Sequence, residues 1–175
     1  MKLSRGVVLS SCVALLALVG AARAETKVEL KGVHLCCKQC VNAVGGILKD
    51  AGVKGACDQK ARTVTITAAD AKAAQKAVDA LTAAGFHGTP SSKDVTIKDD
   101  SGATAGKVKS LTVSGAHNCC AQCCKAIKAT VGAVPGVKAD TAKPKANTFE
   151  VTGDFDAAAL VKALNDAGFH VKVKK

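Results

Sequence analysis

The chain has 175 residues, of which 48% are hydrophobic and only 2% aromatic, and its formal net charge is +11 at pH 7. Trp and Tyr are absent and the lysines are scattered, so the stacking side chains and arginine clusters of nucleic-acid-binding proteins are missing. The composition therefore argues against nucleic acid as a partner and predicts a basic, solvated surface.

The first 24 residues have the pattern of a secretory signal peptide. Two basic residues precede an apolar run at 6–20, and Ala-Arg-Ala at 22–24 is a pattern that signal peptidase cleaves. A lipobox-like stretch at 9–12 lies too early in the apolar run to displace this interpretation. No later stretch reaches the roughly 20 apolar residues of a spanning helix. We therefore expect a secreted or periplasmic protein that has no integral membrane segment after cleavage of residues 1–24.

Beyond the signal peptide, one pattern of elements occurs twice at an offset of 83 residues. Each copy begins with the alternating apolar and polar residues of a half-buried strand. A cysteine-rich loop follows, and apolar residues at helical spacing then predict a helix. These helix residues are Val41, Val44, Ile47 and Leu48 in the first copy and Ile127, Val131 and Val134 in the second.

Further strands and a second helix complete each copy. Alternating apolar residues predict a third strand at 64–66 and 149–151, each after a turn and a short second strand. The final strand is clear at 171–174 and shorter in the first copy. The order β-α-β-β-α-β predicts an α+β fold of two tandem ferredoxin-like βαββαβ sandwiches, each with two helices on one face of a four-stranded antiparallel sheet.

Caps mark the second helix of each copy. Asp70 and Asp156 are the expected N-caps, and Gly85 and Gly168 the expected C-caps.

The composition changes between the two copies. We expect domain 1 at 25–89, a Gly-, Ser-, Asp- and Thr-rich linker at 90–107 and domain 2 at 108–175. Residues 95–97 interrupt the linker with strand character and could pair with 108–113 through a turn at 99–106.

Two cysteine-rich loops carry the chemistry of the chain. The stretch His34-Leu35-Cys36-Cys37-x-x-Cys40 returns as His117-Asn118-Cys119-Cys120-x-x-Cys123. Six of the eight cysteines after the signal peptide lie in these loops, where disulfides would close tiny rings and stabilise the fold little. The start of a helix favours the thiolate form of a cysteine. Clustered thiols at such a position are typical of soft-metal ligands or redox centres.

With the strand before them and the helix after them, these loops resemble those of the heavy-metal-associated domain family. That family includes copper chaperones and periplasmic mercury-scavenging proteins. The resemblance implies a C-x-x-C metal site in each copy, with Cys37 and Cys40 as ligands in the first and Cys120 and Cys123 in the second.

The loops also depart from the family pattern. Each is two residues longer, Leu35 and Asn118 stand where a buried Met is usual, and Cys36 and Cys119 supply an extra thiol. Two thiolates suit Cu(I) or Hg(II), a third would give a trigonal site, and an added His would approach the tetrahedral set of Zn(II). We favour Cu(I) and keep Zn(II) and Hg(II) as alternatives. The predicted metal ligands are Cys36, Cys37, Cys40, Cys119, Cys120 and Cys123.

The remaining histidines and cysteines allow two interpretations. His34 and His117 are either additional ligands or residues that orient the loop by a hydrogen bond. Cys57 and Cys124 lie outside the repeated motif, and we expect both to behave as small buried apolar residues.

A Phe-His dipeptide follows the second helix of each copy. The resemblance implies that Phe86 and Phe169 face the metal site and shield it from water, although a plain core position is also open. His87 and His170 follow directly and either approach the site or merely end the helix-to-strand turn.

The leading functional hypothesis is a non-enzymatic protein with a soft-metal site in each domain. It would sequester the ion or exchange it with a donor or acceptor protein. If the linker folds the domains face to face, the two loops could instead share one cluster. A thiol-disulfide oxidoreductase that uses the C-x-x-C pairs is the main alternative, and an interaction module with local disulfides is a third.

Overall fold

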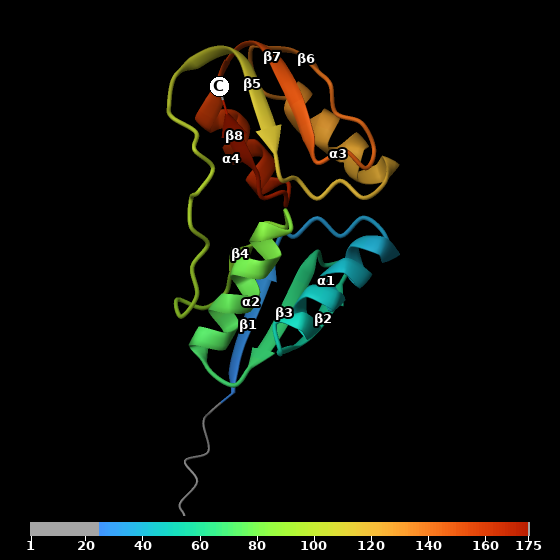
Figure 1. Cartoon of the computed structure of the whole chain (residues 1–175), viewed down its shortest axis with the longest axis vertical. Coiled ribbons are helices and arrows are strands. Elements are labelled where there is room, and N and C mark those ends of the chain that lie inside the picture. The colour runs from blue at the N-terminus through green and yellow to red at the C-terminus, as the bar shows by residue number, and fades with distance from the viewer. Residues whose placement is uncertain (1–24, 175) are drawn as a thin grey trace, which may run out of the picture.

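The computed structural model describes residues 25–174, and the predicted signal peptide lies outside them (Figure 1). These residues form two consecutive units. In the first unit the elements are β1 (Thr26–Lys31), α1 (Lys38–Asp50), β2 (Lys54–Asp58), β3 (Thr63–Ala68), α2 (Ala71–Ala83) and β4 (Thr89–Pro90). In the second unit they are β5 (Lys107–Ser114), α3 (Ala121–Gly132), β6 (Val137–Asp140), β7 (Thr148–Asp156), α4 (Ala157–Asp166) and β8 (Lys172–Lys174).

Each unit builds one four-stranded antiparallel sheet. The strand order is β2-β3-β1-β4 in the first sheet and β6-β7-β5-β8 in the second, so the two units have the same topology. The predicted α+β fold of two ferredoxin-like units is therefore confirmed. The last strand is short in both, with two residues in β4 and three in β8.

Helices cover one face of each sheet, as Figure 1 shows for α1 and α2. The burial pattern along β3 alternates strictly, as expected of a strand with one face in the core. Burying each large apolar side chain of such a core stabilises the fold by about 1.5–3 kcal/mol. The core residues contributed by the first unit include Val28, Leu30, Val44, Leu48, Val64, Ile66, Val78 and Leu81. No helix within residues 25–174 is long and apolar enough to cross a bilayer.

The predicted caps of α2 and α4 are present. The Asp70 and Asp156 carboxylates each accept a hydrogen bond from the backbone N–H three residues later, at 2.8 Å. Gly85 and Gly168 follow the two helices with φ of +86° and +96°, a backbone conformation that favours glycine. The chain therefore turns sharply after each helix, toward the other unit.

The predicted pairing of residues 95–97 with 108–113 is wrong, because the segment between the units forms no strand. Along one side of β5 runs β7, and β8 occupies part of the other side. Val95 is instead buried in the hydrophobic core, which removes its apolar side chain from water without a strand.

Hydrogen bonds fasten this connecting segment at both ends. The amide side chain of Gln75 in α2 bonds the N–H and the carbonyl of Thr96, both at 2.8 Å. At the other end the Ser101 carbonyl accepts a hydrogen bond from the Val173 N–H at 2.7 Å. The segment is therefore held against both units.

Candidate metal centre

The two units meet at the ends that carry the cysteine loops (Figure 1). Their contact is reciprocal. The N–H of His87 donates to the carbonyl of Gly168 at 3.0 Å, and the N–H of His170 donates to the carbonyl of Gly85 at 3.0 Å. Corresponding residues exchange equivalent bonds, so the junction has approximate two-fold symmetry.

Two glycines make this close approach possible. A Cβ built on Gly85 would lie 2.1 Å from the Gly115 carbonyl oxygen, and one built on Gly168 would lie 2.4 Å from the His34 nitrogen. Contacts between real Cβ atoms and other heavy atoms are never that short. Each glycine therefore lets the end of one helix touch the cysteine loop of the other unit.

Aromatic stacking across the junction positions the loop histidines. His34 lies over Phe169 with ring centroids 4.4 Å apart, and His117 stacks on Phe86 at 4.0 Å. Both Phe side chains are almost fully buried. The Nε2 atoms of both histidines are also buried and have no hydrogen-bond partner. Two imidazole nitrogens are thus held beside the loops with unused binding capacity.

The junction brings all six predicted ligand cysteines together. Every cysteine within residues 25–174 is a free thiol. Five Sγ–Sγ distances cross between the units: 3.3 Å for Cys36–Cys123, 3.6 Å for Cys40–Cys119, 3.7 Å for Cys40–Cys123, 3.7 Å for Cys36–Cys120 and 3.8 Å for Cys37–Cys120. The two loops therefore form one thiol cluster, which is the shared arrangement that the sequence left open.

The start of a helix positions two thiols from each loop, as predicted. Cys37 and Cys120 are the N-cap residues of α1 and α3, and both have an extended backbone. Cys40 and Cys123 lie in the first turn and are completely buried. The start of a helix favours negative charge, and in α3 the backbone N–H groups of Gln122 and Cys123 bond the Cys120 sulfur.

The loops are held in place by different residues. Leu35 is buried in the first unit, as the Met of the family pattern would be. Asn118 is also buried, and its Nδ2 donates to the carbonyls of Lys143 and Ala146, both at 2.8 Å. In the second unit a polar anchor therefore ties the cysteine loop to the β6–β7 hairpin.

The cluster separates the pKa values of its thiols. A hydrogen bond from Cys123 lowers the pKa of Cys40 to about 2, while burial raises the pKa of Cys36. The backbone N–H of Cys123 lowers the pKa of Cys120 to about 7. The cluster therefore holds thiolate at neutral pH beside neighbours that keep their protons, and a cation can replace those protons.

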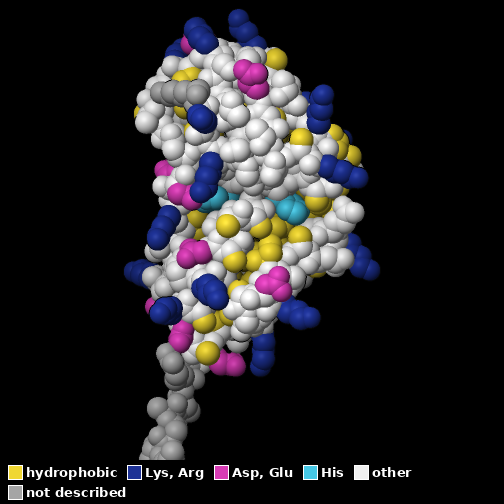
Figure 2. Space-filling model, viewed as in Figure 1, with side chains coloured by type: hydrophobic (Ala, Val, Ile, Leu, Met, Phe, Trp, Pro, Cys, Tyr) yellow, Lys and Arg dark blue, Asp and Glu magenta, His cyan; other side chains and the backbone are white. Residues whose placement is uncertain are grey.

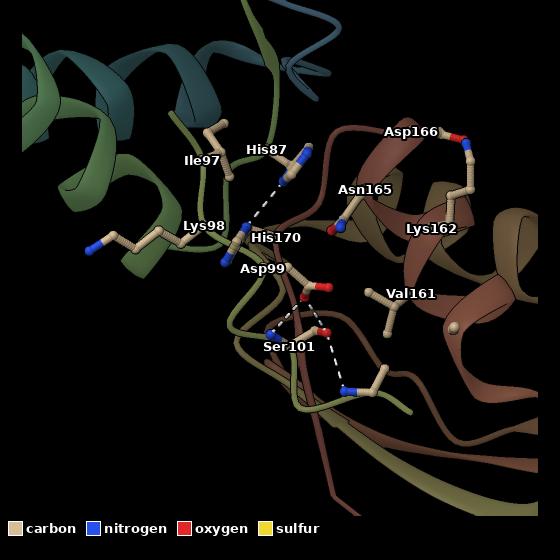
Figure 3. Close-up of a pocket in the computed structure, with 12 residues that line it drawn as sticks. His87, Ile97, Lys98, Asp99, Ser101, Val161, Lys162, Asn165, Asp166 and His170 are labelled. Atoms are coloured by element: carbon tan, nitrogen blue, oxygen red, sulfur yellow. Dashed lines mark hydrogen bonds and ion pairs between the residues drawn. The ribbon is translucent and has the colours of Figure 1, made fainter. Parts of the chain in front are cut away.

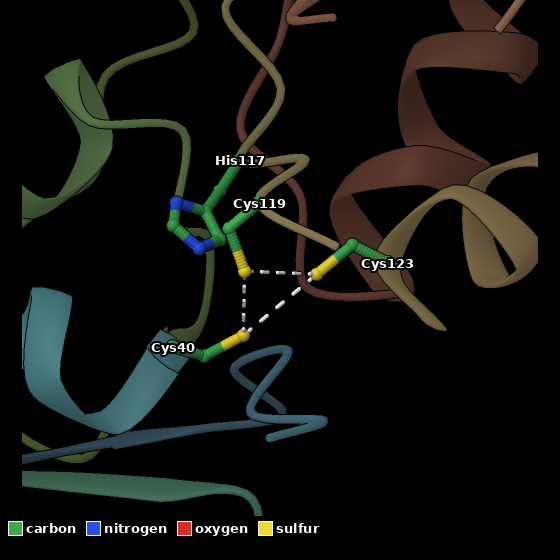
Figure 4. A group of neighbouring side chains, drawn as sticks. All are labelled: Cys40, His117, Cys119 and Cys123. Carbon is green, nitrogen blue, oxygen red and sulfur yellow. Dashed lines mark hydrogen bonds between the residues drawn. The ribbon is translucent and has the colours of Figure 1, made fainter. Parts of the chain in front are cut away.

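Candidate ligand atoms that lie within 4.8 Å of one another form four groups. They are Cys36–Cys37–Cys40, Cys37–Cys119–Cys120, His34–Cys36–Cys123 and Cys40–His117–Cys119–Cys123. Figure 4 shows the last group, in which three sulfurs face one another and the His117 ring lies beside them. Each group offers mainly sulfur and no carboxylate, which is the donor set that soft cations prefer.

Two cysteines stay outside these groups. Cys124 is 4% exposed on α3, as expected of a small buried residue. Cys57 lies on β2 and is only half-buried, so its predicted burial is partial. Burial raises the pKa of the Cys57 thiol, which keeps it protonated.

His87 and His170 contact each other rather than the thiols. Their Nδ1 atoms are 3.1 Å apart, and Nε2 of His170 lies 2.8 Å from Asp100 in the connecting segment. Figure 3 shows the two rings beside a pocket of about 330 Å³ between this segment and α4. Burial, followed by the charge of His170, lowers the pKa of His87 to about 4. The pair therefore belongs to the junction, where His87 is neutral.

Sequence reasoning missed Arg62, which links the two units. Its Nη2 donates to the carbonyls of Gly32 at 2.7 Å and Ala167 at 2.8 Å, one on each side of the junction. An arginine in a predicted hairpin reads as ordinary surface charge, so no signal in the sequence pointed to this role. On the face that Figure 2 shows, other Lys and Arg side chains are spread over both units, while histidine side chains mark the waist.

Comparison with known proteins finds a family match in the second unit. The family model of the heavy-metal-associated domain matches residues 110–170. Among solved structures, the chain is similar to the N-terminal soluble domains of Bacillus subtilis CopA, with 16% identity over 87% of this chain and 95% of that one and a TM-score of 0.30. A score that low does not establish a common arrangement. A comparison with curated proteins finds no relative.

Proposed function

Because residues 110–170 are a heavy-metal-associated domain and the first unit repeats its topology and its cysteine loop, we propose that this protein binds soft metal ions, with Cu(I) as the preferred ion. It acts outside the cytoplasm, as a binding protein and not as an enzyme. The signal peptide pattern of residues 1–24 supports this location.

The convergence of six thiols at the junction carries the proposal. Nine Sγ–Sγ distances among them lie between 3.3 and 3.8 Å. Six thiols without carboxylates are a donor set for Cu(I) or Hg(II). Zn(II) prefers four ligands, and the group with His117 offers the one four-ligand set among the candidate groups of residues 25–174.

The exposure of the thiols supports exchange with a partner. Cys40 and Cys123 are buried, whereas the other four thiols are half-buried. A thiolate of a donor or acceptor protein can approach a bound ion from the half-buried side and replace one ligand at a time. Sequestration and transfer therefore use the same site.

A metal titration tests the proposal. The reduced chain from Glu25 onward is titrated with Cu(I), Zn(II) and Hg(II) against competing chelators. Cys40→Ser/Cys123→Ser should weaken Cu(I) binding by at least 100-fold, whereas the control Cys57→Ser should bind like the parent chain. Binding no tighter than that of free thiols would overturn the proposal, and reduction of insulin by the same sample would favour the oxidoreductase alternative.

A further inference from the structure

The six sulfurs of the junction form a closed polyhedron. Four of them make a ring, in the order Cys37, Cys40, Cys123 and Cys120, whose edges are 3.7, 3.7, 3.8 and 3.8 Å. The remaining two, Cys36 and Cys119, each lie within 4.8 Å of all four ring sulfurs. Two atoms that cap the same ring without overlapping must lie on opposite sides of it. The sulfurs therefore stand at the corners of a distorted octahedron.

An octahedron has eight triangular faces, and four of them can be chosen so that no two share an edge. Here one such choice is Cys36–Cys37–Cys40, Cys37–Cys119–Cys120, Cys40–Cys119–Cys123 and Cys36–Cys120–Cys123. Each sulfur belongs to two of these faces. Three of the faces belong to the candidate ligand groups, and the fourth shares two sulfurs with the His34 group.

Each of these faces has the size of a three-coordinate site for a thiophilic ion. The corners of a triangle with edges near 3.7 Å lie about 2.1 Å from its centre, and a metal–thiolate bond is about 2.3 Å long. An ion therefore fits at or just above each face. Faces that share an edge have centres only about 1.7 Å apart, whereas the four chosen faces have centres about 2.5 Å apart. Four ions can thus be held, and eight cannot.

We propose that the junction holds a single cluster of four Cu(I) ions bridged by six thiolates, rather than one ion per domain. This inference rests on the proposed function. Four Cu(I) and six thiolates carry a net charge of −2, and up to six thiol protons leave on assembly without any change of oxidation state. Four Zn(II) ions would each demand a fourth ligand, which the six sulfurs cannot supply.

The surroundings of the cluster match this charge. The N-termini of α1 and α3 both end at cluster cysteines and favour negative charge. His34 and His117 each place a ring nitrogen within 4.8 Å of cluster sulfurs, on two of the four faces. An imidazole N–H there can donate to a bridging thiolate.

Native mass spectrometry of the reduced chain from Glu25 onward, with Cu(I) added in steps, tests the cluster. We expect saturation at four ions per chain, with the metal-free and four-copper forms dominating at half loading because the bridging ligands couple the ions. Proton release, up to six protons per four ions and measured by pH titration in weak buffer, is the second readout. X-ray absorption should show three sulfurs per copper and a short copper–copper distance.

The extra cysteine of each loop supplies the decisive variant. Cys36→Ser/Cys119→Ser removes both caps of the ring and leaves the two C-x-x-C pairs, so the load should fall to two ions or fewer while tight binding persists. Cys57→Ser is the matched control and should still take four ions. Saturation of the parent chain at two ions that load independently would overturn the cluster but leave the proposed function standing. Absence of tight binding would overturn both.

Discussion

The two cysteine loops hold equivalent thiols with different supports. In the first loop the apolar Leu35 is buried, and the Val33 N–H donates to the Arg62 carbonyl at 2.9 Å. In the second loop the polar Asn118 is buried, and its carbonyl accepts from the Lys145 N–H at 2.9 Å. Both loops therefore lean on the hairpin of their own unit. Thiol position depends on this backbone attachment, and the anchoring side chain can be apolar or polar.

Arg62 and Lys145 occupy corresponding hairpin positions and share a rare backbone conformation, with φ of +56° and +69°. Their side chains nevertheless act differently. Arg62 reaches across the junction to Ala167, whereas Lys145 is exposed and makes no hydrogen bond or ion pair through its side chain among those described for residues 25–174. The thiol cluster is thus nearly symmetric, whereas the Arg62 side chain that bridges the junction has no equivalent at Lys145.

The largest effect is expected from disrupting the contact that each loop makes with the opposite helix end. In Gly85→Ala the new Cβ would lie 2.3 Å from the His117 nitrogen, which must push the second loop away. We expect loss of the shared thiol cluster and a fall in Cu(I) capacity to two ions or fewer. Small-angle X-ray scattering should show the two units moving apart.

Gly52→Ala is the matched control for that variant. Gly52 follows α1 with φ of +74°, yet a Cβ there meets nothing within 4 Å. The substitution should cost about 1–2 kcal/mol of stability from left-handed backbone strain alone and leave the Cu(I) capacity unchanged. Equal copper capacities of the two variants would mean that the glycine contact does not hold the loops together.

A smaller effect is expected from removing the polar anchor of the second loop. Asn118→Ala leaves the carbonyls of Lys143 and Ala146 without their donor, which should lower the free energy of unfolding by about 2–3 kcal/mol. Urea denaturation measures the change. Asn147→Ala, at an exposed position of the same hairpin, should change stability by less than about 0.5 kcal/mol. Asn118→Leu, which copies the first loop, should not restore stability, because the carbonyls remain unpaired.

The histidine pair predicts a loss of stability in acid. The pKa of His87 in the fold is about 4, below its ordinary value of 6.5, so the unfolded chain binds the proton more readily. The stability that neutral His87 provides is complete above pH 6.5 and is lost as the pH falls toward 4. After discounting for partial exposure we expect a loss on the order of 1 kcal/mol, or about 2–4 °C in Tm. His87→Gln should flatten this part of the pH profile, and an unchanged profile would contradict the assignment.

The smallest effect is expected from changing the Arg62 contact across the junction. Arg62→Lys keeps the charge but loses the forked guanidinium group, whose Nη2 donates to two carbonyls. At this exposed position we expect the free energy of unfolding to fall by about 1 kcal/mol or less. Lys145→Arg offers the second loop a similar fork and should raise the Tm by a degree or two. Thermal unfolding of the single and double variants measures both changes, and a Tm of Arg62→Lys equal to that of the parent would show that the fork contributes nothing.

Periodicity and repetition in the sequence predicted the fold, because strand alternation, helical spacing and caps such as Asp70 are local signals. The cysteine spacing predicted which thiols gather at each helix start. The sequence left open whether the two loops meet. Contacts such as the stacking of Phe86 on His117 join residues from different units, so no local pattern signals them. The strand expected at 95–97 failed for a related reason, because the backbone of Thr96 bonds the distant Gln75 side chain of α2 instead of pairing with β5.

The reciprocal contact between the units has the form of an isologous interface, in which the same patch appears on both partners. Such a patch, isolated on a single-domain protein, would favour a homodimer that assembles only at sufficient concentration. Here the connecting segment between Pro90 and Lys107 keeps the second patch within reach, so the effective concentration of one patch near the other does not depend on the protein concentration. Tandem duplication thus turns an encounter between molecules into an intramolecular closure, and the site should assemble equally well however dilute the protein is.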